Sequence, residues 1–246
     1  MSKKTLLGVC TVLLLAVAGA SFYKVGSFYI DVTKARRLKQ NIKTVLTEAD
    51  DTKGFSKEDW NNLKELNDDV VGYMLFSDNW IAEPIVQGTD NDFYLYHSID
   101  GSWSDFGSIY LDASNKVEDQ NKTIYGHNIF MEGDLMFTPL TTLVAQDEFE
   151  KHHSFQIYWE DHFSCYEITH VYYWDEIYDK DFDYKQTTFT DPEFDDYLNW
   201  LDQHNEIVSE ETLSNEHCFV SLQTCKDLSS SVRIIITAKE ITREAY

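Results

Sequence analysis

Short segments rich in Val, Ile, Tyr and Phe follow one another from residue 81 to residue 238, each bounded by Gly, Asn, Asp or Ser. Branched and aromatic side chains fit the half-buried surface of a pleated strand, and the residues between them favour turns. The segments expected to be strands are 81–86, 107–111, 123–125, 154–160, 164–173, 217–222 and 232–238. Many short strands at this density predict a closed β-barrel or a β-sandwich.

Three helices are expected around this β-rich body. Residues 31–48 place apolar side chains at helical spacing. Residues 56–59 read as a capping box that begins a helix running toward Leu66. Asp191 as N-cap, with Pro192 in the first turn, begins a helix through Leu201. The predicted fold class is therefore mainly β with peripheral helices.

The N-terminus carries an uncharged run from Leu6 to Tyr23 after Lys3 and Lys4. It is just long enough to span a bilayer as a helix. A cleaved signal peptide is the alternative, because residues 18–20 (Ala-Gly-Ala) fit a cleavage site. More basic residues follow the run than precede it, but a large domain can be exported despite that bias. We therefore expect residues 24–246 to lie outside the cell membrane on a single-pass anchor.

Composition excludes some functions. A content of 43% apolar residues, with 15 Tyr, 15 Phe and 6 Trp, is enough for a sizeable core. The formal net charge of −23 argues against nucleic-acid binding, which needs a basic face to displace counterions from phosphates. That charge serves solubility, or it attracts cationic partners such as an amine.

The four cysteines divide between two places. Cys10 lies in the apolar run, and Cys165, Cys218 and Cys225 lie in the exported part. An odd number outside leaves at least one free thiol, which a nucleophile requires. Cys165 and Cys218 are expected to be buried strand residues, with a disulfide between them as the alternative.

The sequence does not predict a metal site. The eight histidines lack a tight ligand spacing for zinc. The acidic stretch 175–183 has alternating aspartates, but it lacks the central glycine and the terminal glutamate of a calcium loop. It is expected to be a solvated connection, so no metal is predicted.

The residues that carry chemistry are a thiol, an imidazole and a guanidinium. Cys225 follows the predicted strand 217–222, so its thiol is displayed at a strand end. Arg233 lies eight positions on, on the same side of its strand as Ile235 and Thr237. A charge among apolar neighbours indicates either a structural ion pair or support for an oxyanion. His127 lies upstream and could exchange protons with a thiol.

Six pieces of the sequence resemble the class B sortases, in the order found in that family. Residues 221–225 (Ser-Leu-Gln-Thr-Cys) are similar to its Thr-Leu-x-Thr-Cys strand end, with Ser221 in place of Thr. The other pieces are 67–73, 84–87 with 90–95, 107–112, 125–128 with 136–137, and the arginine at 233. The match covers roughly residues 56 to 240.

The resemblance implies a closed sortase-type β-barrel over residues 67–246, a helical stem over 24–66 and a membrane anchor or signal segment over 1–23. It also implies a cysteine transpeptidase with His127, Cys225 and Arg233 as catalytic residues. Ser221, Leu222 and Thr224 are then expected to border the substrate groove. No cofactor is expected, because the three side chains supply nucleophile, acid/base and charge stabilisation.

The same resemblance implies the partners. Substrates would be surface or pilin proteins with a C-terminal sorting signal, cleaved after Thr through a thioacyl-enzyme. The acceptor would be an amine of peptidoglycan or a pilin lysine, so both wall anchoring and pilus assembly are expected roles. Two alternatives stay open: a hydrolytic cysteine peptidase, and a non-catalytic, membrane-anchored barrel that binds wall components.

Overall fold

The computed structural model describes residues 3–46 and 55–245, and the remaining positions of the predicted anchor, stem and barrel lie outside these ranges. The described residues form eight strands that close into one barrel in the order β1-β2-β3-β4-β7-β8-β6-β5. The strands are β1 Val70–Phe76, β2 Ala82–Val86, β3 Ile109–Leu111, β4 Asn121–Tyr125, β5 Ser154–Trp159, β6 His162–Asp175, β7 Phe219–Cys225 and β8 Val232–Ala245. The predicted closed barrel is confirmed.

Most neighbouring strands are antiparallel, but β2–β3 and β4–β7 are parallel. Alternate side chains of each strand point into the barrel, where Ile124, Leu222 and Ile236 join the main apolar core. The intervening side chains point outward. The outer faces of β6, β7 and β8 are covered by α4 (Asp191–His204), through a second cluster that includes Phe219 and Ile235.

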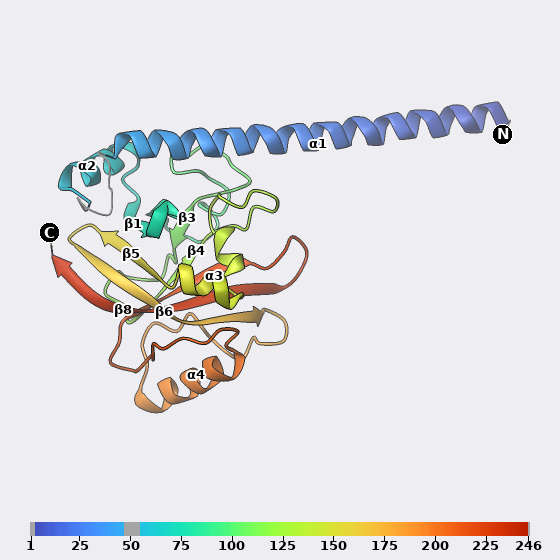
Figure 1. Ribbon diagram of the computed structural model, residues 1–246. Coiled ribbons are helices and arrows are strands. Elements are labelled where there is room, and N and C mark those ends of the chain that lie inside the picture. The colour runs from blue at the N-terminus through green and yellow to red at the C-terminus, as the bar shows by residue number, and fades with distance from the viewer. Residues whose placement is uncertain (1–2, 47–54, 246) are drawn as a thin grey trace.

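Helix α1 (Lys3–Val45) crosses one side of the barrel and continues far beyond it (Figure 1). It contains one exposed stretch that is long and apolar enough to cross a membrane. It is one unbroken helix through residue 23, where the sequence suggested a division between anchor and stem. Helix α2 (Lys57–Leu66) begins with the predicted capping box of Ser56 and Asp59.

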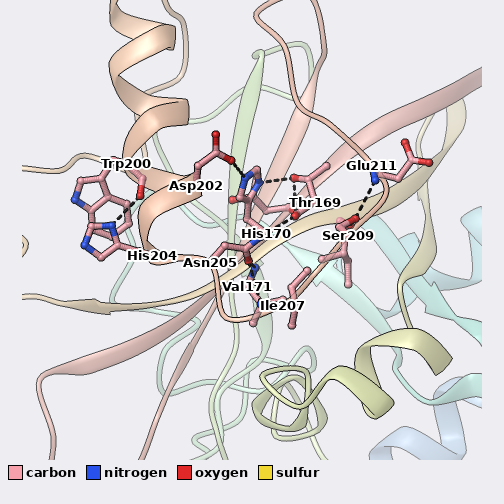
Figure 2. Close-up of polar contacts among 12 residues, drawn as sticks. Thr169, His170, Val171, Trp200, Asp202, His204, Asn205, Ile207, Ser209 and Glu211 are labelled. Carbon is pink, nitrogen blue, oxygen red and sulfur yellow. Dashed lines mark hydrogen bonds and ion pairs between the residues drawn. The ribbon is translucent and has the colours of Figure 1, made fainter.

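The C-terminal end of α4 is fastened to β6 by polar contacts (Figure 2). The buried imidazole of His170 lies between the Thr169 hydroxyl at 2.9 Å and the Asp202 carboxylate at 3.1 Å. The side-chain oxygen of Asn205 accepts the backbone N–H of Val171 at 2.9 Å. Burial lowers the pKa of His170, although Asp202 acts in the opposite direction, so the neutral ring is favoured.

Several details differ from the sequence-based expectations. The prediction missed β1 and the one-and-a-half-turn α3 (Gln146–Lys151). The N-cap of α4 is Thr190 rather than Asp191, because the Thr190 hydroxyl and Glu193 form a capping box one position earlier. The helix expected over 31–48 ends at Val45, and residues 47 and 48 lie outside the described ranges.

All four cysteines lie in the described residues, and all are free thiols. The alternative of a disulfide between Cys165 and Cys218 is therefore wrong. Both are half-buried rather than buried, because Cys165 alternates with the core residue Tyr166 near the start of β6 and Cys218 directly precedes β7. The thiol required of a nucleophile is available at Cys225.

Candidate active site

Three adjacent strands bring the predicted catalytic residues to one end of the barrel. Cys225 is the last residue of β7 and lies opposite Arg233 of β8 in the antiparallel register. Strand β4 runs parallel to β7, with Tyr125 opposite Gln223. Continuing that register by two residues brings His127 level with Cys225. Since side chains alternate along a strand, Cys225 and Arg233 belong to the outward-facing sets of β7 and β8, and His127 has the same phase as outward-facing Tyr125 two residues beyond the end of β4.

The imidazole of His127 is oriented by a backbone carbonyl. Its Nε2 lies 2.9 Å from the carbonyl oxygen of Leu95. A carbonyl can only accept, so Nε2 carries the hydrogen, and in the neutral ring Nδ1 is the atom that can take up a proton. Burial lowers the pKa of His127, opposed by the Leu95 contact and by the charge of Asp105. The neutral ring, which is the form able to act as a base, is therefore favoured.

Two neighbours of His127 hold its segment in place. Gly126 allows a close approach of Phe137, whose ring would lie 2.6 Å from any Cβ at that position. The side-chain nitrogen of Asn128 donates to the backbone carbonyls of Cys225 at 3.0 Å and Lys226 at 3.2 Å. Asn128 therefore ties the histidine segment to the end of the strand that carries the thiol.

We expect Asn128→Asp to lower kcat by about 10- to 100-fold with little change in KM, because small displacements of reacting groups reduce rates steeply. The carboxylate has the same shape but cannot donate, so two carbonyls lose their partner. The free energy of unfolding should fall by about 1–3 kcal/mol. Kinetics and thermal denaturation of Asn128→Asp and Asn128→Gln check this, and Gln, which keeps the donor, should recover part of the rate. Unchanged kcat in the Asp variant would show that the tie has no role in positioning.

Arg233 is held by contacts that leave part of its guanidinium unused. Its Nη2 lies 2.9 Å from the carboxylate of Glu176, and its Nη1 donates to the carbonyls of Ser230 and Val232 at 3.2 and 3.4 Å. Of the two roles expected for Arg233, the structural ion pair is therefore present. A guanidinium has five N–H donors, so these contacts do not use them all. The oxyanion role stays a prediction.

Two tyrosines lie close to the end of β7, where the thiol of Cys225 is half-buried. Burial chiefly raises the pKa of Tyr110, and the nearby charges of Asp112 and Cys225 add to the effect. The Tyr184 hydroxyl donates to the side chain of Gln223, two residues before the thiol on the same strand face. Burial raises the pKa of both hydroxyls, so they are neutral at ordinary pH.

The residues expected to border a substrate groove are buried. Ser221 and Leu222 have no exposed surface: Ser221 donates to Asn121 at 3.0 Å, and Leu222 belongs to the main core. Thr224 is also buried, and its hydroxyl has no partner within the described residues. Substrate contact by these three stays a prediction, and for Ser221 and Leu222 it would require side chains that are fully buried to become exposed.

Other charged groups near the site have local structural contacts. Asp227 accepts the backbone N–H groups of Ser229 and Ser230 at 2.9 and 2.8 Å, which lowers the pKa of its carboxyl. It caps its own turn, as expected for a loop carboxylate.

Among residues 3–46 and 55–245, no group of three or more His, Cys, Asp or Glu side chains is arranged to hold a metal.

Comparisons with known proteins agree with this geometry. No protein-family model matches the chain. The sortase B of Listeria monocytogenes is 30% identical, over 99% of this chain and 100% of that protein. The structure of Clostridium perfringens sortase B is 30% identical with a TM-score of 0.66, covering 74% of this chain and all of that one. A Staphylococcus aureus sortase B–substrate complex has the same fold, with a TM-score of 0.73 at 21% identity, covering 87% and 97% of the two chains.

A closed barrel of this topology, together with these relatives, defines a sortase-type cysteine transpeptidase. The chain belongs to the sortase B family.

Proposed function

We propose that this transpeptidase cleaves a C-terminal sorting signal after Thr and transfers the new acyl end to an amine, with His127, Cys225 and Arg233 as its catalytic residues. The observation that carries the proposal is the register of β4, β7 and β8. It supports the proposal because Cys225 and Arg233 are paired at this end of the barrel and His127 follows β4 by two residues toward the same end. The relative solved as a substrate complex supports a peptide substrate.

The chemistry follows from the state of each group. The neutral His127 takes the proton of the Cys225 thiol as sulfur attacks the Thr carbonyl carbon. The carbonyl oxygen becomes an oxyanion, which the unused donors of Arg233 stabilise. The C–N bond then breaks as His127 returns the proton to the leaving amine, and a thioester to Cys225 remains. An incoming amine reverses these steps, forming an amide and releasing the thiol.

The proposed location is the outer face of the cell membrane. The 18 uncharged residues from Leu6 to Tyr23 form about 27 Å of helix, close to the thickness of the hydrocarbon layer. Because α1 continues without a break onto the barrel, it would tether the enzyme as a single-pass anchor. Substrates would be exported proteins held near the same membrane, as surface proteins or pilins.

The acceptor amine separates this proposal from a hydrolytic peptidase. The full-length enzyme is incubated with a panel of sorting peptides, with and without an amine such as triglycine or a lysine peptide. Mass spectrometry then identifies the product. A transpeptidase gives a new amide whose yield rises with amine concentration. Carboxylic acid as the sole product at every amine concentration would assign the chain to the peptidases.

A further inference from the structure

Exposed apolar side chains gather on the loops around the active-site end of the barrel. Trp103, Phe130, Met131 and Leu228, here called the apolar rim, are 64%, 52%, 81% and 77% exposed. Phe130 and Met131 follow His127 by three and four residues, and Leu228 lies in the loop between Cys225 and Arg233. Large apolar side chains exposed together on a soluble surface mark an interaction site.

Helix α1 runs toward this same end of the barrel. Near its C-terminus, Ile42 packs against the cluster that contains α2. Further toward the N-terminus, Arg36 pairs with Glu132 at 2.6 Å and Asp134 at 3.1 Å. Further still, Phe28 and Val32 pack against residues of the loops that carry the apolar rim. The rings of Phe28 and Phe106 lie 5.7 Å apart.

The N-terminal half of α1 then continues past the barrel, on the side where the loop between β7 and β8 lies (Figure 1). From Phe28 to the end of the uncharged run at Tyr23 is five residues, or about 7–8 Å along the helix. The interfacial layer on each side of a bilayer is about 5–8 Å thick. The loops packed on Phe28 therefore reach the level of that layer when the run spans the membrane.

We propose that the active-site end of the barrel rests on the lipid surface, with the apolar rim in the interfacial layer. This inference rests on the proposed membrane anchor. Trp, Phe and Met suit this position because their apolar bodies enter the headgroup region, where Trp in particular is enriched. The mouth of the active site then faces the bilayer rather than the wall, so it would take substrates close to the membrane.

Basic side chains of α1 lie beside the rim. The chain as a whole, with its net charge of −23, would be repelled by anionic lipids. At the rim, however, Arg36 pairs with Glu132 and Asp134 and offsets one of their two negative charges, and Lys24 and Lys34 are exposed on α1, with Lys34 3.7 Å from Asp31. Basic residues next to a span attract anionic headgroups. The acidic loop after β6 lies on the side of the barrel away from α1 (Figure 1), and its first residue, Glu176, pairs with Arg233.

The fluorescence of Trp103 tests the proposal. All six tryptophans lie in the described residues, and Trp103 is the exposed one among them. The full-length protein is placed in nanodiscs of phosphatidylcholine and phosphatidylglycerol, with or without bromine on the acyl chains. Subtracting the emission of Trp103→Phe isolates the Trp103 signal. We expect that signal to shift to shorter wavelength in nanodiscs, and to lose most of its intensity with brominated lipid.

Variants of the other rim residues sharpen the test. Phe130→Ser with Met131→Ser should weaken the quenching of Trp103. Leu66→Ser with Ile241→Ser, exposed apolar residues at the end of α2 and in the C-terminal part of β8, should leave it unchanged. A Trp103 signal equally open to aqueous iodide in nanodiscs and in detergent would overturn the proposal. So would equal quenching in the two double variants. Cleavage of a soluble sorting peptide in detergent should be unaffected in every variant. If the wild-type protein cleaves no sorting peptide, that result counts against the proposed function and not against the membrane contact.

Discussion

Cys225→Ala is expected to abolish cleavage of every sorting peptide, lowering the rate by a factor on the order of 10⁴ or more. No other group at the site can form the thioester, because His127 and Arg233 only move a proton and stabilise charge. The fold should persist, since the thiol is half-buried at the end of β7 and fills no part of the main core. Peptide-cleavage rates and the thermal midpoint of the purified variant measure both effects.

Cys165→Ala and Cys218→Ala are the matched controls, because both are free, half-buried thiols outside the site. Both should keep the wild-type rate. Turnover by Cys225→Ala within tenfold of the wild type would remove Cys225 from the mechanism. So would loss of activity in all three alanine variants without loss of fold.

Arg233→Lys is expected to lower kcat by about 10²- to 10³-fold, the effect of losing one well-placed oxyanion donor. Lysine keeps the positive charge but not the planar fork that can hold Glu176 and still donate to a carbonyl oxygen. Because the ion pair with Glu176 is partly exposed, its loss should change the free energy of unfolding by only about 0–1 kcal/mol. Activity should therefore fall far more than stability.

The partner residue provides the control. Glu176→Gln removes the ion pair but keeps an oxygen that can accept from Arg233, so it should retain most of the activity. Rates and thermal midpoints for Arg233→Lys, Arg233→Ala and Glu176→Gln are compared side by side. If Arg233→Lys turns over normally while Glu176→Gln and Arg233→Ala both unfold at lower temperature, Arg233 is a structural ion-pair residue and not an oxyanion donor.

The sequence predicted correctly the helices whose starts are set by residues within one helical turn. The capping box at Ser56 and the late helix with Pro192 in its first turn both form, because their signals lie within one helical turn. The density of short apolar segments predicted a barrel or a sandwich, and the resemblance to the family selected the closed barrel. Strand β1 was missed because six of its seven residues are buried, so it shows no alternation, and α3 because six residues are too few for a period.

The site was predictable only in its chemistry. A thiol at a strand end and an arginine on an apolar strand are visible in the sequence, and a family motif selected His127 from eight histidines. The partners of these groups were not visible. Glu176 reaches Arg233 across 57 positions through the pairing of β6 with β8, and the Leu95 carbonyl, in the loop between β2 and β3, reaches His127 across 32. Pairing of β7 with β4 and β8 buries Ser221 and Leu222, which motif position alone could not reveal.

The mass of the enzyme during turnover tests the central claim most directly. The full-length protein is mixed with a cleavable sorting peptide in the absence of an amine, quenched in acid and analysed intact and after digestion. A mass increase equal to the peptide up to its Thr, located on Cys225 and removed by added triglycine with formation of an amide, is the predicted result. Peptide cleavage that proceeds with no acyl adduct on Cys225 at any time, or with the adduct on another residue, would contradict it.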